Sequence, residues 1–137
     1  MQSKVHSHFH RVTYGDCTDG NHIYYGRYLY ILEEARGEFF RSLGITFRDY
    51  YEQGVLFPVS EVCIKYHLHA EYDDELIIES YITKLKGARL GFGYRIKRDS
   101  VLILEGETLH GCTDKNGSVK RLPAQLKDSL QLFIADN

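Results

Sequence analysis

Four polar side chains of the segment 15–22 are the first candidates for chemistry. Two of them are the carboxylates Asp16 and Asp19, and the others are Asn21 and His22. A carboxylate or an imidazole can act as a general base or as a nucleophile toward a carbonyl carbon. Such a reaction also needs donors for the oxyanion that develops, and the unpaired backbone N–H groups at a helix N-terminus can supply them. The segment therefore predicts carbonyl chemistry if a helix begins directly after it.

A long helix is predicted over residues 25–43. The amides of Tyr25 and Gly26 would then be oxyanion donors, because they stand in the first turn and glycine lets a substrate approach the backbone closely. The residues that we predict to take part in catalysis are Asp19, Asp16, Tyr25, Gly26 and His22.

The same residue types are also common in turns and at helix caps. Each of these residues therefore has a structural role as the alternative to catalysis. For Asp16 it outweighs catalysis, since this residue directly follows the first strand and can accept hydrogen bonds from loop amides. His22 is interpreted as a hydrogen-bonding loop residue rather than as the base. Asp19 is followed by Gly20, which lets the loop bulge toward the amides, so we place the catalytic carboxylate on Asp19.

The helix is expected to be buried, because apolar residues recur along one stripe at helical spacing: Tyr28, Ile31, Leu32, Ala35, Phe39 and Leu43. Leu29 and Phe40 add an apolar patch on the far side. Gly44 is a suitable residue to end the helix. The helix is therefore predicted to lie at the centre of the fold.

The remaining chain alternates as β-strands do. Strands are predicted at 5–14, 57–69, 75–85, 89–98 and 102–112, with a turn at 114–117 leading to a short strand near Val119 and a C-terminal helix over 124–134. Short connections imply antiparallel pairing, and only the long helix can cover the apolar face of the sheet. The prediction is an α+β hot-dog fold, an antiparallel sheet wrapped around a long central helix, with residues 1–137 as a single domain.

Three alternating histidines, His6, His8 and His10, resemble a row of metal ligands. Metal sites need convergent ligands and supporting contacts, whereas one strand supplies a single row. We therefore expect a solvated or interface-facing strand and no metal.

Composition narrows the class of protein. A net charge of -2 is not typical of nucleic-acid binding, and three widely spaced cysteines indicate neither a disulfide framework nor a zinc site. No apolar run has the length of a membrane span, and the N-terminal residues lack the apolar core of a signal peptide. These features favour a cytoplasmic protein.

Several motifs resemble the 4-hydroxybenzoyl-CoA thioesterase family of hot-dog acyl-CoA thioesterases. They are the runs RVTYGDC (11–17), YYGRYL (24–29), EEAR (33–36), YDDEL (72–76) and RLP (121–123). This resemblance implies hydrolysis of an acyl-CoA or acyl-carrier-protein thioester by a homo-oligomer, a dimer or a tetramer. It implies no cofactor other than the coenzyme A of the substrate.

One position departs from the family pattern. Family members carry Asp-x-Asp in the loop that begins at Asp16, with the second Asp as nucleophile or base. In this sequence the position of the second Asp is occupied by Thr18. Either Asp19 takes the role after a shift by one residue, or Asp16 serves, or activity is lost. The last option leaves a catalytically silent hot-dog module that binds an acyl chain or a carrier protein. Dehydration of a hydroxyacyl-CoA is a weaker third hypothesis, because His22 is not five residues after either Asp.

Substrate-binding residues are predicted in two places. Asn21 and Tyr28 are assigned from the loop and the helix, while Arg89, Arg95 and Lys97 form a basic cluster on one strand that could contact CoA phosphates. A solvated sheet edge explains the same cluster equally well. For the oligomer, the strands 89–98 and 102–112 are the candidates for edge pairing between subunits. Glu33 is considered for an interface or a neighbouring active site, with a solvated position as the safer expectation.

Overall fold

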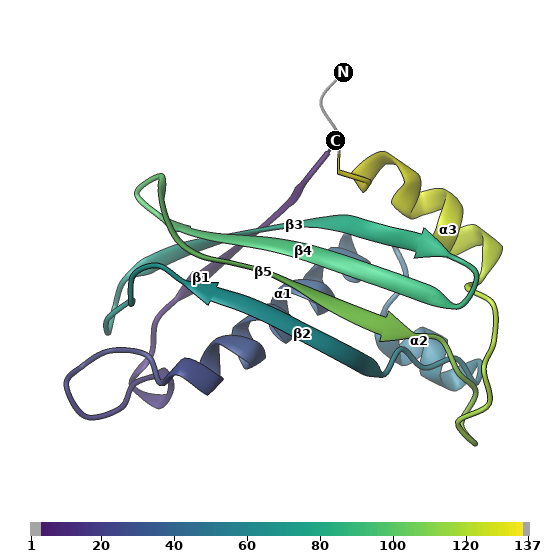
Figure 1. The fold of residues 1–137 in the computed structure, drawn as a ribbon, viewed down its shortest axis with the longest axis horizontal. Helices are drawn as coiled ribbons and strands as arrows, with labels where there is room; N and C mark the ends of the chain where they lie inside the picture. Colours follow the sequence, from purple (N-terminus) through teal and green to yellow (C-terminus); the bar gives the residue numbers. More distant parts are fainter. Residues whose placement is uncertain (1–3, 136–137) are drawn as a thin grey trace.

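A computed structural model describes residues 4–135 and shows one antiparallel sheet. Figure 1 shows its strands, whose lateral order is β1-β3-β4-β5-β2. Their bounds are β1 His6–Arg11, β2 Val59–Tyr66, β3 Glu75–Lys86, β4 Arg89–Arg98 and β5 Val101–Gly111. The tight connections β3–β4 and β4–β5 bend at residues with positive φ, Gly87 at 62° and Asp99 and Ser100 at 52° and 68°. The five long strands that were predicted and their antiparallel pairing are confirmed.

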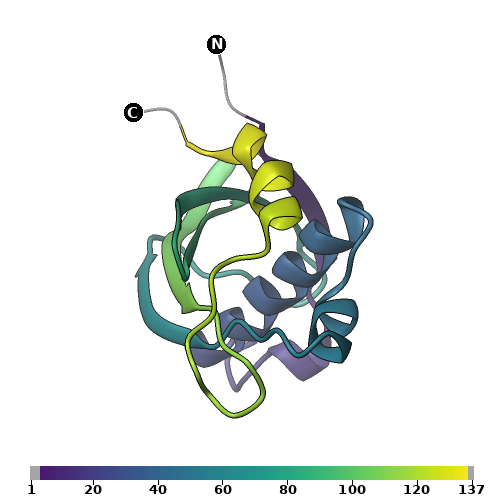
Figure 2. The same ribbon diagram turned by 90° about the vertical axis from the view of Figure 1, so that its right-hand side faces the viewer.

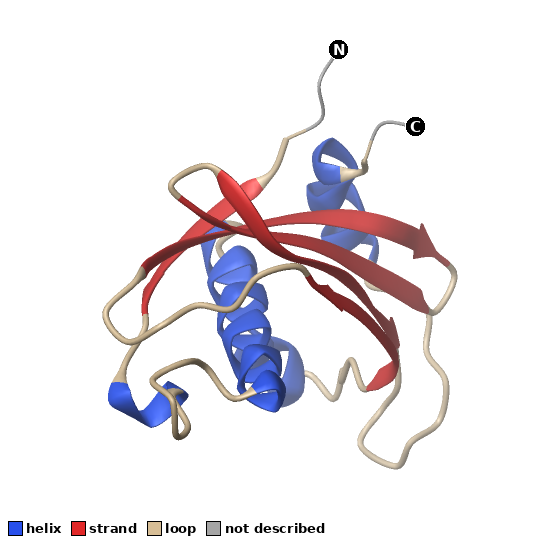
Figure 3. Ribbon diagram, turned by 60° about the vertical axis from the view of Figure 1, so that its left-hand side comes forward, coloured by secondary structure: helices blue, strands red, loops and turns tan. Residues whose placement is uncertain are grey.

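The long helix α1, Tyr28–Ser42, packs against one face of this sheet, as Figures 2 and 3 show. It is preceded by a single 3-10 turn, η2, over Tyr25–Arg27, so helical structure begins at the predicted residue. It ends where Gly44, at φ 88°, donates its N–H to the Arg41 carbonyl over 3.0 Å. The predicted α+β hot-dog architecture is confirmed.

The core lies between α1 and the sheet. On β4 every second residue is fully buried and faces the helix: Leu90, Phe92, Tyr94 and Ile96. The predicted stripe of α1 packs against this face, with Leu32, Ala35 and Phe39 at 0% exposure. On the far side of the helix Phe40 is buried as well, but Leu29 remains 41% exposed.

Smaller elements close the ends of the sheet. The short helix α2, Phe47–Glu52, begins with a capping box in which Thr46 Oγ accepts from the Asp49 N–H over 3.1 Å. The C-terminal helix α3, Ala124–Leu130, continues into the 3-10 turn η3, Gln131–Phe133. A strand near Val119 is not formed: this residue is 78% exposed and makes one isolated bridge with Thr113.

Two expectations from the sequence are wrong. The strands 89–98 and 102–112 are not edges, because β2 crosses over to pair with β5, which leaves β1 and β2 at the two sides of the sheet. The histidines of β1 do not face solvent, because alternate residues of this strand point toward α1. The His6 ring stacks on Phe39 with 5.2 Å between ring centroids.

Candidate functional site

Asp16 anchors the polar loop to the fold. It lies in the 3-10 turn η1, Tyr14–Asp16, and is 1% exposed. Its carboxylate accepts hydrogen bonds from the Thr13 N–H over 3.0 Å, from Arg27 Nε over 2.8 Å and from His10 Nε2 over 2.8 Å. Burial raises the pKa of this carboxyl, but the three donors outweigh it and hold the pKa at about 2. Asp16 is therefore an ionised anchor that joins β1 to the turn before α1.

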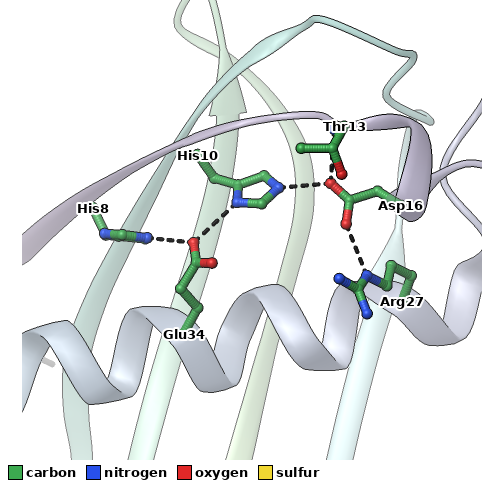
Figure 4. A network of polar contacts seen from close by, with 6 residues as sticks. All are labelled: His8, His10, Thr13, Asp16, Arg27 and Glu34. Carbon is green, nitrogen blue, oxygen red and sulfur yellow. Dashed lines mark hydrogen bonds and ion pairs between the residues drawn. The ribbon is translucent and has the colours of Figure 1, made fainter.

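The contacts continue along the helix, as Figure 4 shows. His10 Nδ1 lies 2.9 Å from Glu34 Oε2, and His8 Nε2 lies 2.6 Å from the same oxygen. Burial raises the pKa of Glu34, but the hydrogen bonds from His8 and His10 lower it by more. His10 thus stands between two carboxylates and contacts one with each of its ring nitrogens. This chain of contacts fixes β1 on α1.

The loop after Asp16 is a small hairpin. Cys17 and Ile23 form an isolated bridge, and the Thr18 N–H donates to the His22 carbonyl over 2.9 Å. Gly20 and Asn21 turn the chain with φ of 93° and 65°. Asp19 therefore lies at the exposed tip of the hairpin.

A cavity of about 380 Å³ opens beside this hairpin. Its wall includes residues from the loop, from α1 and from the segment after β2: Thr18, His22, Tyr25, Tyr28, Tyr66 and His69. The Tyr66 hydroxyl donates to the Tyr25 carbonyl over 2.9 Å, and the buried Tyr28 hydroxyl accepts from the Ala70 N–H over 3.0 Å. These two bonds hold the 3-10 turn η2 against the cavity.

The turn η2 presents backbone donors. Arg27 N–H donates to the Tyr24 carbonyl over 2.8 Å, and Tyr24 N–H donates to the Asp16 carbonyl over 3.2 Å. Within residues 4–135 the amides of Tyr25 and Gly26 have no acceptor, as expected at a helix start. A Cβ on Gly26 would come within 2.8 Å of the Tyr24 ring, so any larger residue here would require that ring to move.

A second cavity of about 390 Å³ also borders η2. Residues of η2, of α1, of the edge strand β2 and of β5 line it: Gly26, Leu29, Glu33, Arg36, Val62 and Thr108. Of the two residues with unpaired amides, Tyr25 thus lines the first cavity and Gly26 the second.

The predicted residues are only partly brought together. His22, Tyr25 and Tyr28 line the first cavity and Gly26 the second. Asp16 is held in its ion pairs, while Asp19 and Asn21 lie at the exposed hairpin tip, outside both sets of lining residues. Their roles stay predictions.

The basic cluster lies away from the loop. Arg95 and Lys97 project from the sheet face opposite the core and pair with Glu79 at 3.1 and 3.0 Å. Arg89 on β4 lies opposite Gly111 on β5, at the end of the sheet where β2 begins. Tyr66, which lines the loop cavity, is at the other end of β2, roughly 20 Å farther along that strand.

Three residues around the cavities were not singled out from the sequence: Tyr66, His69 and Arg36. For Arg36 a signal exists, since it is a charge next to Ala35 within an otherwise apolar stripe. Tyr66 and His69 carry no such signal, because they belong to the strand β2 and the segment after it.

No ligand cluster of three metal-binding side chains is found in the part of the chain that the structure describes, and no helix there is long and apolar enough to span a membrane. The acidic and histidine side chains of Figure 4 contact one another directly, with His10 Nε2 2.8 Å from Asp16 and His8 Nε2 2.6 Å from Glu34.

The sequence is similar to those of known proteins. Residues 12–131 match the thioesterase-like superfamily. An acyl-CoA thioesterase YbgC of Haemophilus influenzae is 33% identical over 105 residues, covering 76% of this chain and 77% of the relative. A 1,4-dihydroxy-2-naphthoyl-CoA hydrolase of Synechococcus elongatus is 28% identical over 124 residues, covering 88% and 91%.

Solved structures agree with the architecture. A probable thioesterase from Bartonella henselae has a TM-score of 0.83 and 26% identity, covering 88% of this chain and 100% of that one. A protein from Thermus thermophilus has a TM-score of 0.89 at 24% identity, covering 97% and 100%.

Proposed function

Because the chain belongs to the thioesterase-like superfamily, we propose that it hydrolyses an acyl-CoA thioester to a free acid and coenzyme A. The observation that carries this proposal is the pair of unpaired amides at Tyr25 and Gly26, two neighbouring residues of which one lines the first cavity and the other the second. One cavity can take the acyl group and the other the pantetheine arm, so that the thioester lies at the amides.

The reaction then needs only groups of this chain. The thioester oxygen accepts from the two amides, which stabilise the negative charge that develops on it. A base takes a proton from water, and the hydroxide forms a C–O bond to the carbonyl carbon. The C–S bond breaks with its electron pair on sulfur, and the base returns its proton to the departing thiolate.

The hairpin supplies the base in this proposal, and two of its side chains are candidates. His22 lines the first cavity, as Tyr25 does, and this supports it as a candidate. Asp19, our choice from the sequence, lies at the tip and would act after the loop bends inward or in a site completed by a second copy. Asp16 has a supporting role, because it already accepts three hydrogen bonds.

Release of free thiol from a panel of aliphatic and aromatic acyl-CoAs tests this function. We expect turnover by the wild type. Replacing the true base, by His22→Gln or by Asp19→Asn, should lower kcat about a hundredfold or more with an unchanged melting temperature, since both side chains are outside the core.

Asp16→Asn serves as the contrasting variant. It should lower activity and melting temperature together, because it removes the charge that holds Arg27 in the turn η2. Near wild-type turnover in both His22→Gln and Asp19→Asn would refute a hairpin base.

The proposal includes a homodimer formed through the edge strand β2. Each residue of β2 except Ile64 is exposed, and Val59 and Val62 are apolar side chains at 48% and 47% exposure. The second cavity borders the same strand, so a partner on this edge would cover it. Edge pairing is therefore expected at β2. Assembly of dimers into a tetramer remains part of the proposal.

A catalytically silent acyl-binding module is the second candidate. The observation in its favour is that none of the residues lining the first cavity is a carboxylate, with Thr18 at the position where related enzymes carry the second Asp. Absence of turnover with every acyl-CoA and acyl-carrier protein, combined with binding of a hydrolysis-resistant CoA thioether, would support it.

The finer resemblance to 4-hydroxybenzoyl-CoA thioesterases is also part of the proposal. It rests on the run from Gly15 to Tyr28, whereas the relatives include proteins named for other acyl groups. The assay panel therefore includes aromatic substrates, and an acyl-carrier protein as an alternative donor.

A further inference from the structure

Arg36 is a charge inside the core that no carboxylate neutralises. It is 8% exposed on α1, and its Nη1 donates to the Tyr94 hydroxyl over 3.0 Å. Among the described residues it takes part in no ion pair. A guanidinium carries five N–H donors, and this contact uses one of them.

The other guanidinium nitrogens are not shut away from solvent. Within residues 4–135, the buried side-chain nitrogen and oxygen atoms without a partner belong to His6 and Ser80, and none belongs to Arg36. Arg36 lines the second cavity together with Glu33, Thr108 and apolar side chains of α1 and β2. A cation therefore stands in the wall of this cavity.

The orientation of Arg36 is set by a one-way chain of hydrogen bonds. His110 Nδ1 lies 3.0 Å from the Phe57 carbonyl, which can only accept, so this nitrogen donates. Burial lowers the pKa of His110 to about 4, so the ring is neutral and its Nε2 accepts from Thr108 over 2.9 Å.

The Thr108 hydroxyl, having donated to His110, must accept from Tyr94, whose oxygen lies 2.5 Å away. The Tyr94 oxygen is left as an acceptor for Arg36. Each member of the chain thus donates in one direction, and none of them carries a negative charge that would neutralise the guanidinium. The remaining donors of Arg36 suit an anion that enters with the ligand.

Glu33 does not fill this role. It stands three residues earlier on α1 and borders the same cavity, but its side chain is exposed and no ion pair joins it to Arg36 in the described chain. It lies at the rim, where water solvates it.

We propose that Arg36 selects acyl groups that end in a carboxylate, which it binds inside the second cavity. This inference rests on the proposed function, since it takes that cavity as the acyl site. A cavity of about 390 Å³ lies in the range of small-molecule sites. Ten residues separate Gly26 from Arg36, roughly 15 Å along a helix, and a helical side chain leans back toward the N-terminus. The carboxylate would therefore belong to an acyl chain of medium length.

Two hydrolysis-resistant CoA thioethers test the proposal by calorimetry on the intact chain, one with a hexyl group and one with a hexyl group ending in carboxylate. We expect the wild type to bind the carboxylate form about 10- to 100-fold more tightly, the range of a charge-assisted hydrogen bond. Arg36→Met should abolish this preference, and Arg36→Lys should retain part of it. Tyr94→Phe, which removes the anchor but keeps the charge, should reduce it.

The matched control is Arg41→Met on the same helix, where Arg41 is 63% exposed and pairs with Glu38, and its preference should equal that of the wild type. Equal or weaker binding of the carboxylate form by the wild type overturns the proposal without any variant, as does a preference that survives in folded Arg36→Met.

Thiol release from the corresponding thioesters is measured in parallel. A wild type that hydrolyses thioesters but binds both thioethers with equal affinity refutes only the role of Arg36. A wild type that hydrolyses none, yet binds the carboxylate form through Arg36, refutes only the hydrolase function.

Discussion

Asp16 shows how one residue can connect a loop, a strand and a helix. Its carboxylate is almost fully buried, and its three donors come from β1, from the turn η1 and from the turn η2. A buried charge is tolerated only when it is paired and hydrogen-bonded, which is the case here. The side chain thus holds the two turns that flank the hairpin, and its contribution is to position them.

The ionisation of Asp16 predicts a stability change in acid. Its pKa falls from an ordinary 3.8 to about 2 on folding, so the unfolded chain binds the proton more readily. The contribution, about 2 kcal/mol, is complete above about pH 5, where the unfolded carboxyl is also ionised, and is lost as the pH falls through the folded pKa of about 2. Urea unfolding between pH 5 and pH 2 measures it.

Asp16→Asn provides the control for this pH dependence. The wild-type and variant unfolding free energies should approach each other as the pH falls through 2, since the carboxyl of the wild type becomes neutral below its folded pKa. A constant difference between the two proteins down to that pH would contradict an ionised anchor.

At the scale of elements, the position of β2 on β5 depends on close backbone approach at Gly106. A Cβ at this residue would lie 2.7 Å from the Cys63 carbonyl oxygen and 2.4 Å from Ile64 Cδ1. The side chain of Ile64 can move, but a paired backbone carbonyl cannot move without disturbing the ladder. β2 also forms one wall of the second cavity, so this contact bears on function.

We therefore expect Gly106→Ala to destabilise the fold by about 1–3 kcal/mol, the usual cost of overpacking. Gly111→Ala is the matched control on the same strand, because a Cβ there meets no atom within 4 Å. Thermal unfolding of both variants compares them. Equal melting temperatures would show that β2 can shift freely on β5.

At the scale of the whole molecule, the sheet has an exposed, partly apolar side at β2. The opposite side, β1, is fixed to α1 through His8 and His10. A second copy placed on β2 would continue the sheet and cover the second cavity. Dimer formation would then affect the acyl site, since Val62 lies in the proposed interface and also lines the second cavity.

Light scattering on Val62→Lys tests the dimer. The wild type should have the mass of a dimer at micromolar concentration, and a charge in the middle of the interface should shift it to a monomer with weaker binding of acyl-CoA. Ile77→Lys, a change at an apolar residue of β3 that is 39% exposed, should leave the dimer intact. A monomeric wild type would refute the pairing.

The sequence by itself determined the helix and the strands. The stripe on α1 and the alternation on β3, β4 and β5 depend on which residues face the core along a local segment, and local periodicity records this directly. The helix start at Tyr25, its end before Gly44 and the unpaired amides of η2 follow from the same local rules, because any helix leaves its first N–H groups free.

Only the tertiary structure decided the lateral order of the strands and the surroundings of the polar residues. Nothing local shows that β2 crosses to β5, so the edges could not be placed from sequence. His8 and His10 contact Glu34, and Arg36 lines a cavity, because the fold brings together residues that are far apart in the chain. Side chains such as Asp19 and His22, three residues apart, differ in exposure because the hairpin turns between them, and that turn is set by the contacts at Cys17 and Ile23.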